Sequence, residues 1–170
     1  MTKESLHQKI LREIVEEKRK DPSVVAISVF GSVARGEEKE DSDIDLEIVS
    51  TEEKGWRIFQ KEREGISVTY EMWPEQKFLE RVRQYPFLSY CYVKEKIVYD
   101  PKQILQGVVN QLRIYFSKHP EVVQFWEDKY KEIREAKSRR VSISPIDVYD
   151  EAEIEFSGSH SVTRDFLGSL

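Results

Sequence analysis

Two short motifs, separated by ten residues, contain the side chains in this sequence that are best suited to chemistry. The first is Gly31 and Ser32, directly after an apolar run, and the second is Asp43 and Asp45, where another apolar run begins. A glycine lets a phosphate approach the backbone because no Cβ intrudes. Paired carboxylates are ligands that Mg²⁺ accepts readily. The two motifs together predict chemistry on a nucleoside triphosphate.

A third carboxylate, Glu71, could join the two aspartates. Side chains alternate along a strand, so Asp43 and Asp45 would share one face of a strand over 44–49, and Glu71 would lie on the polar face of a strand over 66–72. If these strands are neighbours, the three carboxylates repel by about 2 kcal/mol per pair at an effective dielectric of 20. A fold rarely keeps such a cluster without cations, so the sequence predicts two Mg²⁺ ions bound there.

Three other residues of the motif region have less specific interpretations. Ser32 is expected to cap a short helix that begins at Val33, whose free N–H groups would face an anion. Arg35 could contact a phosphate or be an ordinary surface cation. Glu47 shares the strand face of the aspartates and is expected to be solvated rather than a ligand.

The elements that must position these residues follow from hydrophobic spacing. Apolar residues at helical spacing predict amphipathic helices, and continuous apolar runs predict buried strands. The expected elements are a helix from Leu6 that ends before Pro22, strands over 24–30 and 44–49, a helix over 52–64, a strand over 66–72, helices over 74–84 and 102–117 with a strand over 94–99 between them, and a charged helix after Pro120.

Composition restricts the class of protein. The chain has 170 residues, 35% of them charged, and no apolar run near the length of about 20 residues that spans a bilayer. The N-terminus lacks the apolar core of a secretory signal. The single cysteine, Cys91, excludes an internal disulfide and points to a reducing compartment. We therefore expect one cytoplasmic domain with no membrane partner.

The net charge and the few histidines further restrict which ligands and partners the chain is expected to bind. The net charge of −5 argues against general nucleic-acid binding, which needs a basic surface. A single nucleotide stays compatible with this charge, because a metal can neutralise its phosphates locally. The three histidines are scattered and form no zinc-type ligand set with Cys91.

Gly31-Ser32, the ten-residue spacer and Asp43-Ile44-Asp45 resemble the signature of the polymerase-β-type nucleotidyltransferase superfamily, and in particular its small members, the minimal nucleotidyltransferases. The resemblance covers about residues 24–100. It implies an α/β fold of the α+β type, with a mixed sheet and helices packed on one face. It also implies transfer of a nucleoside monophosphate, expected to be AMP from ATP, to an acceptor hydroxyl.

The resemblance also implies a role for each motif residue. Gly31 and Ser32 would hold the triphosphate, and Asp43 and Asp45 would bind both metal ions. Glu71 would bind one metal and assist deprotonation of the acceptor. Family members often have an aspartate at this third position, so the glutamate is a departure from the pattern.

The resemblance further suggests a domain organisation. We expect a nucleotidyltransferase domain over 1–100 and a helical C-terminal part of the same domain over 101–137, which shapes the acceptor site in related enzymes. Serine and acidic residues predominate over 138–170, so this tail is expected to be irregular or partner-dependent.

The acceptor stays open between two classes. One is a protein hydroxyl, as in antitoxins of this kind that modify a helical partner toxin. The other is a small molecule such as an aminoglycoside or lincosamide antibiotic, whose charge the acidic segment 147–155 could attract if it is more than a solvated segment. An alternative outside catalysis is a nucleotide-binding module, with aromatic residues after position 114 either as its partner surface or as ordinary core.

Overall fold

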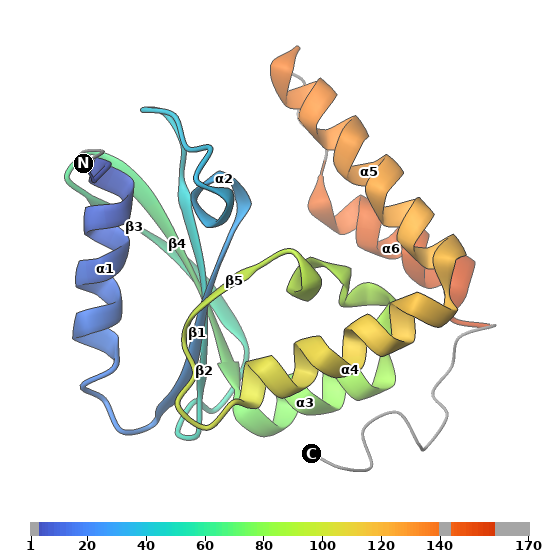
Figure 1. Cartoon of the computed structure of the whole chain (residues 1–170), viewed down its shortest axis with the longest axis horizontal. Coiled ribbons are helices and arrows are strands. Elements are labelled where there is room, and N and C mark those ends of the chain that lie inside the picture. Colours follow the sequence, from blue (N-terminus) through green and yellow to red (C-terminus); the bar gives the residue numbers. More distant parts are fainter. Residues whose placement is uncertain (1–3, 140–143, 159–170) are drawn as a thin grey trace. The chain divides into compact units, whose positions relative to one another are not determined.

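The computed structural model describes residues 4–139 and 144–158. In chain order the elements are α1 (Leu6–Lys18), β1 (Val24–Phe30), α2 (Gly31–Arg35), β2 (Ile44–Ser50), β3 (Arg57–Arg63), β4 (Ile66–Pro74), α3 (Glu75–Gln84), the 3₁₀ helices η1 (Pro86–Leu88) and η2 (Tyr90–Val93), β5 (Lys96–Tyr99), α4 (Ile104–Lys118), α5 (Pro120–Ser138) and α6 (Pro145–Phe156) (Figure 1).

The chain divides into two compact units. The sheet unit consists of the described residues within Met1–Glu80 and Lys94–Val108, and the helical unit of those within Arg81–Val93 and Val109–Leu170. The division falls inside α3 and α4, so each of these helices contributes to both units. The domain boundaries that the sequence suggests, at 100 and 137, stay predictions.

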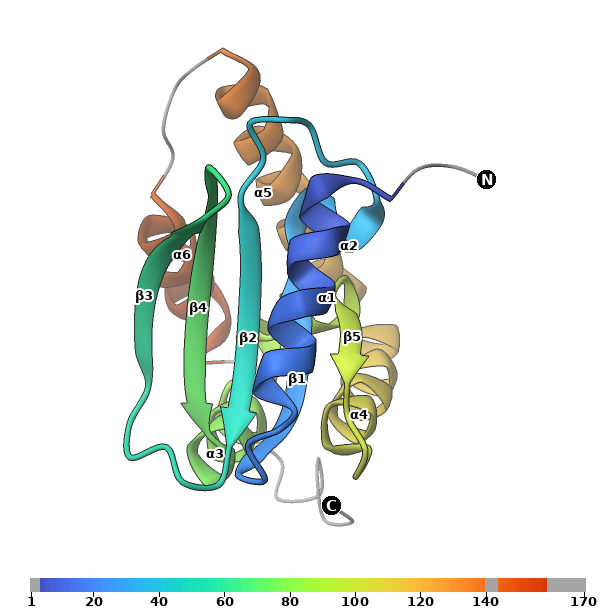
Figure 2. The same ribbon diagram turned by 90° about the vertical axis from the view of Figure 1, so that its left-hand side faces the viewer.

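The sheet unit contains five strands in the order β3-β4-β2-β1-β5 (Figure 2). β2 and β4 are parallel, whereas the β1–β2, β1–β5 and β3–β4 pairs are antiparallel. This arrangement confirms the predicted mixed sheet. Its parallel pair places the two strands that carry the predicted carboxylates next to each other.

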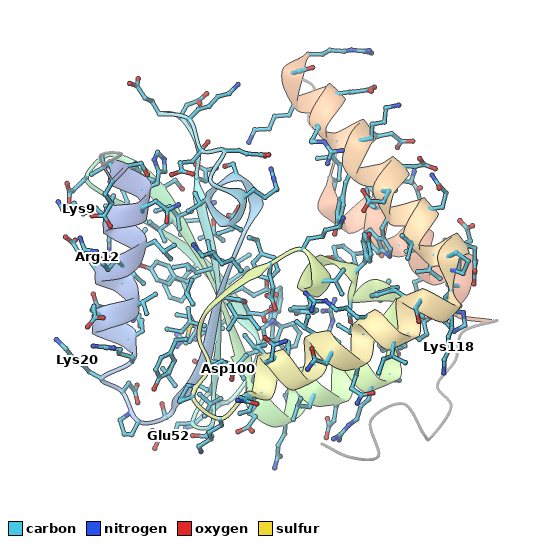
Figure 3. All side chains as sticks on the ribbon, in the orientation of Figure 1. Lys9, Arg12, Lys20, Glu52, Asp100 and Lys118 are labelled. Carbon is cyan, nitrogen blue, oxygen red and sulfur yellow. The ribbon has the colours of Figure 1, made fainter. Side chains whose placement is uncertain are left out.

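One face of the sheet, the apolar face, packs against α1. Ile10, Leu11 and Ile14 of α1 are at most 4% exposed and belong to one core cluster with the apolar residues of β1, β2 and β4. Burial of each such side chain stabilises the fold by about 1.5–3 kcal/mol. The charged residues Lys9 and Arg12 lie on the side of α1 that faces away from the sheet (Figure 3).

The opposite face of the sheet, the polar face, is set by strand alternation. When Leu46 and Ile48 point toward α1, the side chains between them point the other way. The polar face therefore includes Ser28 of β1, Asp45 and Glu47 of β2, and Thr69 and Glu71 of β4.

The helix predicted over 52–64 is wrong, because residues Arg57–Arg63 form strand β3 instead. Glu64 and Gly65 have φ values of 51° and 82°, which suit the two-residue turn of a tight hairpin, and β3 pairs with β4 along its length. Charged side chains on this edge strand conceal the alternation that would have predicted it.

The helical unit has an aromatic core. Trp126 of α5 is 2% exposed, and its Nε1 donates to the carbonyl of Phe87 at 2.7 Å. Tyr115 and Phe116 of α4 are also buried, at 8% and 6% exposed. These burials favour the core interpretation of the three aromatics over a partner surface.

Residues 138–170 were expected to be irregular or partner-dependent, and the irregular alternative is wrong for Pro145–Phe156, which form α6. Val148, Ala152 and Phe156 recur every four residues and are at most 4% exposed, and Pro145 suits a first helical position. Residues 140–143 and 159–170 of that prediction lie outside the described residues. In the part of the chain that the structure describes, no helix combines the length and apolar character of a membrane span.

Candidate functional site

Gly31 lies where β1 turns into α2. Its φ of 68° is in the left-handed region, which favours glycine over residues with a Cβ. The helix begins at Gly31 itself, with Phe30 as its N-cap and no side-chain cap. The predicted capping role of Ser32 is therefore wrong, because the helix starts two residues earlier than expected and places Ser32 in its first turn.

The structure brings the two predicted motifs together. The antiparallel register of β1 and β2 pairs Phe30 with Asp45. As a result, the Oδ2 atom of Asp45 lies 3.6 Å from the position that a Cβ would occupy at Gly31. Asp45 is exposed, and so is Asp43, two residues before it and one residue outside β2. Both aspartates are therefore accessible to solvent, and the carboxylate of Asp45 lies beside the glycine.

Glu71 lies on the same face of the sheet but is not opposite Asp45. The parallel register pairs Asp45 with Thr69, and Glu71 with Glu47. Both indole N–H groups of Trp56 and Trp73 donate to Oε1 of Glu71, at 2.8 and 2.9 Å.

The expected cluster of three carboxylates is not formed in this structure. Among the described residues, no group of three His, Cys, Asp or Glu side chains is placed to hold a metal ion. The register places Glu71 two residues along β4 from Thr69, the residue that faces Asp45, and the two indoles bind its carboxylate. Its role as third ligand stays a prediction.

Arg35 is at the C-terminal end of α2, half-exposed, and its Nε donates to Glu37 at 2.7 Å. It lines an open pocket of about 510 Å³, whose lining also includes Lys96 of β5 and Glu38. An exposed ion pair contributes about 0–1 kcal/mol, so exchange of Glu37 for a phosphate costs little. The contact of Arg35 with a nucleotide phosphate stays a prediction.

Sequence reasoning missed a group of buried polar residues on the polar face. Glu47, expected to be solvated, is 1% exposed and lies opposite Ser28, which is 0% exposed. Both carboxylate oxygens of Glu95, just before β5, are also buried. Alternation along β2 predicts the face of Glu47 correctly but carries no information on whether that face is covered.

The buried carboxyl group of Glu95 has a strongly raised pKa. The pKa of Glu95 is raised from 4.5 to about 8, mainly by burial and to a smaller extent by the charge of Asp100, although the interaction with the Ser28 hydroxyl lowers it. Glu95 is therefore mainly protonated at neutral pH. No motif pointed to this residue.

The donor set fits a magnesium ion. Mg²⁺ is usually held by one or two carboxylates, with waters and substrate phosphates completing its octahedron. Asp43 and Asp45 supply two exposed carboxylates, and the missing Cβ at Gly31 keeps the space next to Asp45 free for a phosphate.

Comparison with known proteins identifies the class. Residues 8–166 match the family described as "Nucleotidyltransferase domain". Because this match covers most of the chain, the protein belongs to that family, and the resemblance predicted from the two motifs is confirmed.

The other comparisons are less informative. A solved structure of a nucleotidyltransferase-like protein from Exiguobacterium sibiricum 255-15 is similar, with 12% sequence identity and a TM-score of 0.49. The match covers 90% of this chain and 64% of that chain, so the present chain spans under two thirds of it. No curated protein matches the sequence.

Proposed function

We propose that this protein is a Mg²⁺-dependent nucleotidyltransferase that moves a nucleoside monophosphate, AMP from ATP, to an acceptor hydroxyl. The observation that carries the proposal is the 3.6 Å approach between Asp45 Oδ2 and the Cβ position of Gly31. A metal-binding carboxylate and a backbone that a phosphate can approach thus lie side by side, in a chain of the nucleotidyltransferase family.

Each motif residue has a defined task in this reaction. Gly31 and Ser32 bind the triphosphate, and Asp43 and Asp45 hold the metal. When bound, Mg²⁺ neutralises phosphate charge as it develops during the displacement. The acceptor oxygen forms a bond to the α-phosphorus, the bond to the β-phosphate oxygen breaks, and pyrophosphate leaves.

The proton of the acceptor hydroxyl needs a base, and Glu71 is the proposed one. Both indole hydrogen bonds end on Oε1, so Oε2 is the atom through which Glu71 would accept the proton or contact a metal. The indoles also fix the orientation of the carboxylate. Arg35 is proposed as an additional phosphate contact from the end of α2.

The test is transfer of label from ATP carrying ³²P at the α-phosphate. Purified protein is incubated with Mg²⁺, labelled ATP and cell extract, and the wild type is compared with the isosteric double variant Asp43→Asn/Asp45→Asn. We expect labelled acceptor and pyrophosphate release with the wild type alone. Equal labelling by both proteins would defeat the proposal.

The same experiment separates the acceptor classes. Label in the precipitated protein fraction indicates a protein hydroxyl, such as that of a helical partner, whereas label in the low-molecular-mass filtrate indicates a small molecule such as an aminoglycoside or lincosamide. ATP binding without transfer to any fraction would instead favour a non-catalytic nucleotide-binding module.

A further inference from the structure

The segment between α2 and β2, residues 36–43, has no helix or strand although it ends in Asp43. Asp43 precedes the first residue of β2, so the sheet register does not fix its backbone. Within the segment, the Lys39 N–H donates to Ser42 Oγ at 2.9 Å, and the Ser42 N–H donates to the Lys39 carbonyl at 3.0 Å. These bonds close a local turn but do not tie it to the rest of the unit.

Side chains at the N-terminal end of α1 provide that tie. They come from the N-cap residue and the first turn, and they contact both ends of the segment. The contacts are His7 Nε2 with the Ser42 carbonyl at 2.8 Å, Ser5 Oγ with Glu38 Oε1 at 2.6 Å, Gln8 Nε2 with Glu38 Oε1 at 3.3 Å, and Gln8 Nε2 with the Val33 carbonyl of α2 at 3.1 Å.

His7 makes the contact nearest to the proposed metal ligand. Its hydrogen bond ends on the carbonyl of Ser42, the peptide group that leads directly into Asp43. A carbonyl can only accept, so Nε2 carries the proton and donates.

Packing alone does not require a histidine at position 7. Ile10, Leu11 and Ile14 dock α1 on the sheet, and an apolar side chain at position 7 would not have to lose hydrogen bonds to water on burial. A polar side chain that is 4% exposed lowers stability unless it makes hydrogen bonds. The bond to Ser42 is therefore the feature that a histidine provides and a leucine would not.

We propose that His7 is a positioning residue that sets Asp43 through the Ser42 carbonyl, while Ser5 and Gln8 hold the other end of the segment. This inference rests on the proposed function, since it takes Asp43 as a metal ligand. The reason for a strong effect is geometric, because a misplacement of about 1 Å in a site can lower activity about 100-fold.

The experiment uses two substitutions of His7 and one matched control. His7→Leu removes the donor but fills the space, and His7→Gln places an amide nitrogen at about the position of Nε2. Leu11→Ala is the control, because it weakens the packing of the same helix without removing a contact to the segment. Melting temperatures of all three variants establish which remain folded.

Two measurements are made on each protein. Mn²⁺ binding with the non-hydrolysable analogue α,β-methylene-ATP is followed by electron paramagnetic resonance, and amide hydrogen exchange is followed over residues 39–45. We expect His7→Leu to weaken Mn²⁺ binding about tenfold and to speed exchange in this segment, with His7→Gln and Leu11→Ala within about threefold of the wild type.

The outcomes separate this inference from the proposed function. A folded His7→Leu variant that binds Mn²⁺ as the wild type does would overturn the positioning role, even if exchange becomes faster. Unchanged exchange over 39–45 in this variant would also overturn it. Failure of the wild type to bind Mn²⁺ with the analogue would instead end the proposed function, and with it the ligand role that His7 is inferred to support.

Discussion

The two faces of the sheet use the same strand alternation for different purposes. On the apolar face, Ile44, Leu46 and Ile48 of β2 are at most 1% exposed against α1. On the polar face, Asp45 is open to solvent next to Gly31, while Glu47, the next side chain along, is buried. Residues that stabilise the unit thus lie on one face and residues available for chemistry on the other, and along β2 the polar face changes from open at Asp45 to closed at Glu47.

The largest expected effect is on the open part of the polar face. Asp45→Asn keeps the shape of the side chain but removes the charge that would bind a metal, so we expect label transfer to fall at least about 1000-fold. Because Asp45 is exposed, the free energy of unfolding should change by less than about 0.5 kcal/mol. Transfer assays and urea unfolding measure the two quantities, and retained transfer would remove Asp45 from the site.

The neighbouring residue on the apolar face should behave in the opposite way. Leu46→Ala leaves a cavity under α1 and should lower the free energy of unfolding by about 2–5 kcal/mol. Transfer per folded molecule should stay within about threefold of the wild type, because the side chain points away from the site. A specific loss of transfer in the folded variant would mean that the two faces are not separable.

The same contrast explains what the sequence could predict. Alternation and apolar runs predicted four of the strands, because a strand of this kind depends on a local sequence pattern. They did not predict β3, because most side chains of this edge strand are charged and an alternation of apolar and polar residues is not visible. They also did not predict α6, because its three buried residues are separated by acidic side chains.

The site was harder to predict for a different reason. The position of Glu71 depends on the register between β2 and β4, and a two-residue change in register would place it opposite Asp45. The burial of Glu47 and Glu95 depends on what covers the face, and no local pattern encodes that cover. Strand faces can thus be predicted from the sequence, whereas register and cover require the structure.

The buried carboxyl group of Glu95 should make the free energy of unfolding depend on pH. The folded pKa of Glu95, about 8, exceeds its unfolded value, so its contribution to stability is complete below pH 4.5 and is lost as the pH rises toward and through 8. Glu95→Gln removes this loss, and we expect the variant to be more stable than the wild type by about 2 kcal/mol at pH 9.

Denaturant unfolding at pH 4.5 and pH 9 measures this difference for Glu95→Gln and for Glu62→Gln, an exposed residue of β3 that serves as the control. Only for Glu95→Gln should the difference in free energy of unfolding from the wild type increase between pH 4.5 and pH 9. A constant offset at both pH values would mean that Glu95 titrates normally and that this part of the polar face is hydrated.

The smallest expected effect is that of alanine at Gly31, which tests whether the missing side chain leaves space for a phosphate. Gly31 and Gly36 share a φ of 68°, so alanine at either position should lower the free energy of unfolding by about 1–2 kcal/mol through the same backbone strain. Their surroundings differ, because a Cβ at Gly31 would lie 3.6 Å from Asp45 Oδ2, whereas at Gly36 it would meet no atom within 4 Å.

We therefore expect Gly31→Ala to lower transfer at least about tenfold more than Gly36→Ala, since only the first Cβ occupies the space proposed for a phosphate. Equal losses of transfer in both variants would trace the effect to backbone strain in α2 and would mean that no phosphate contacts Gly31.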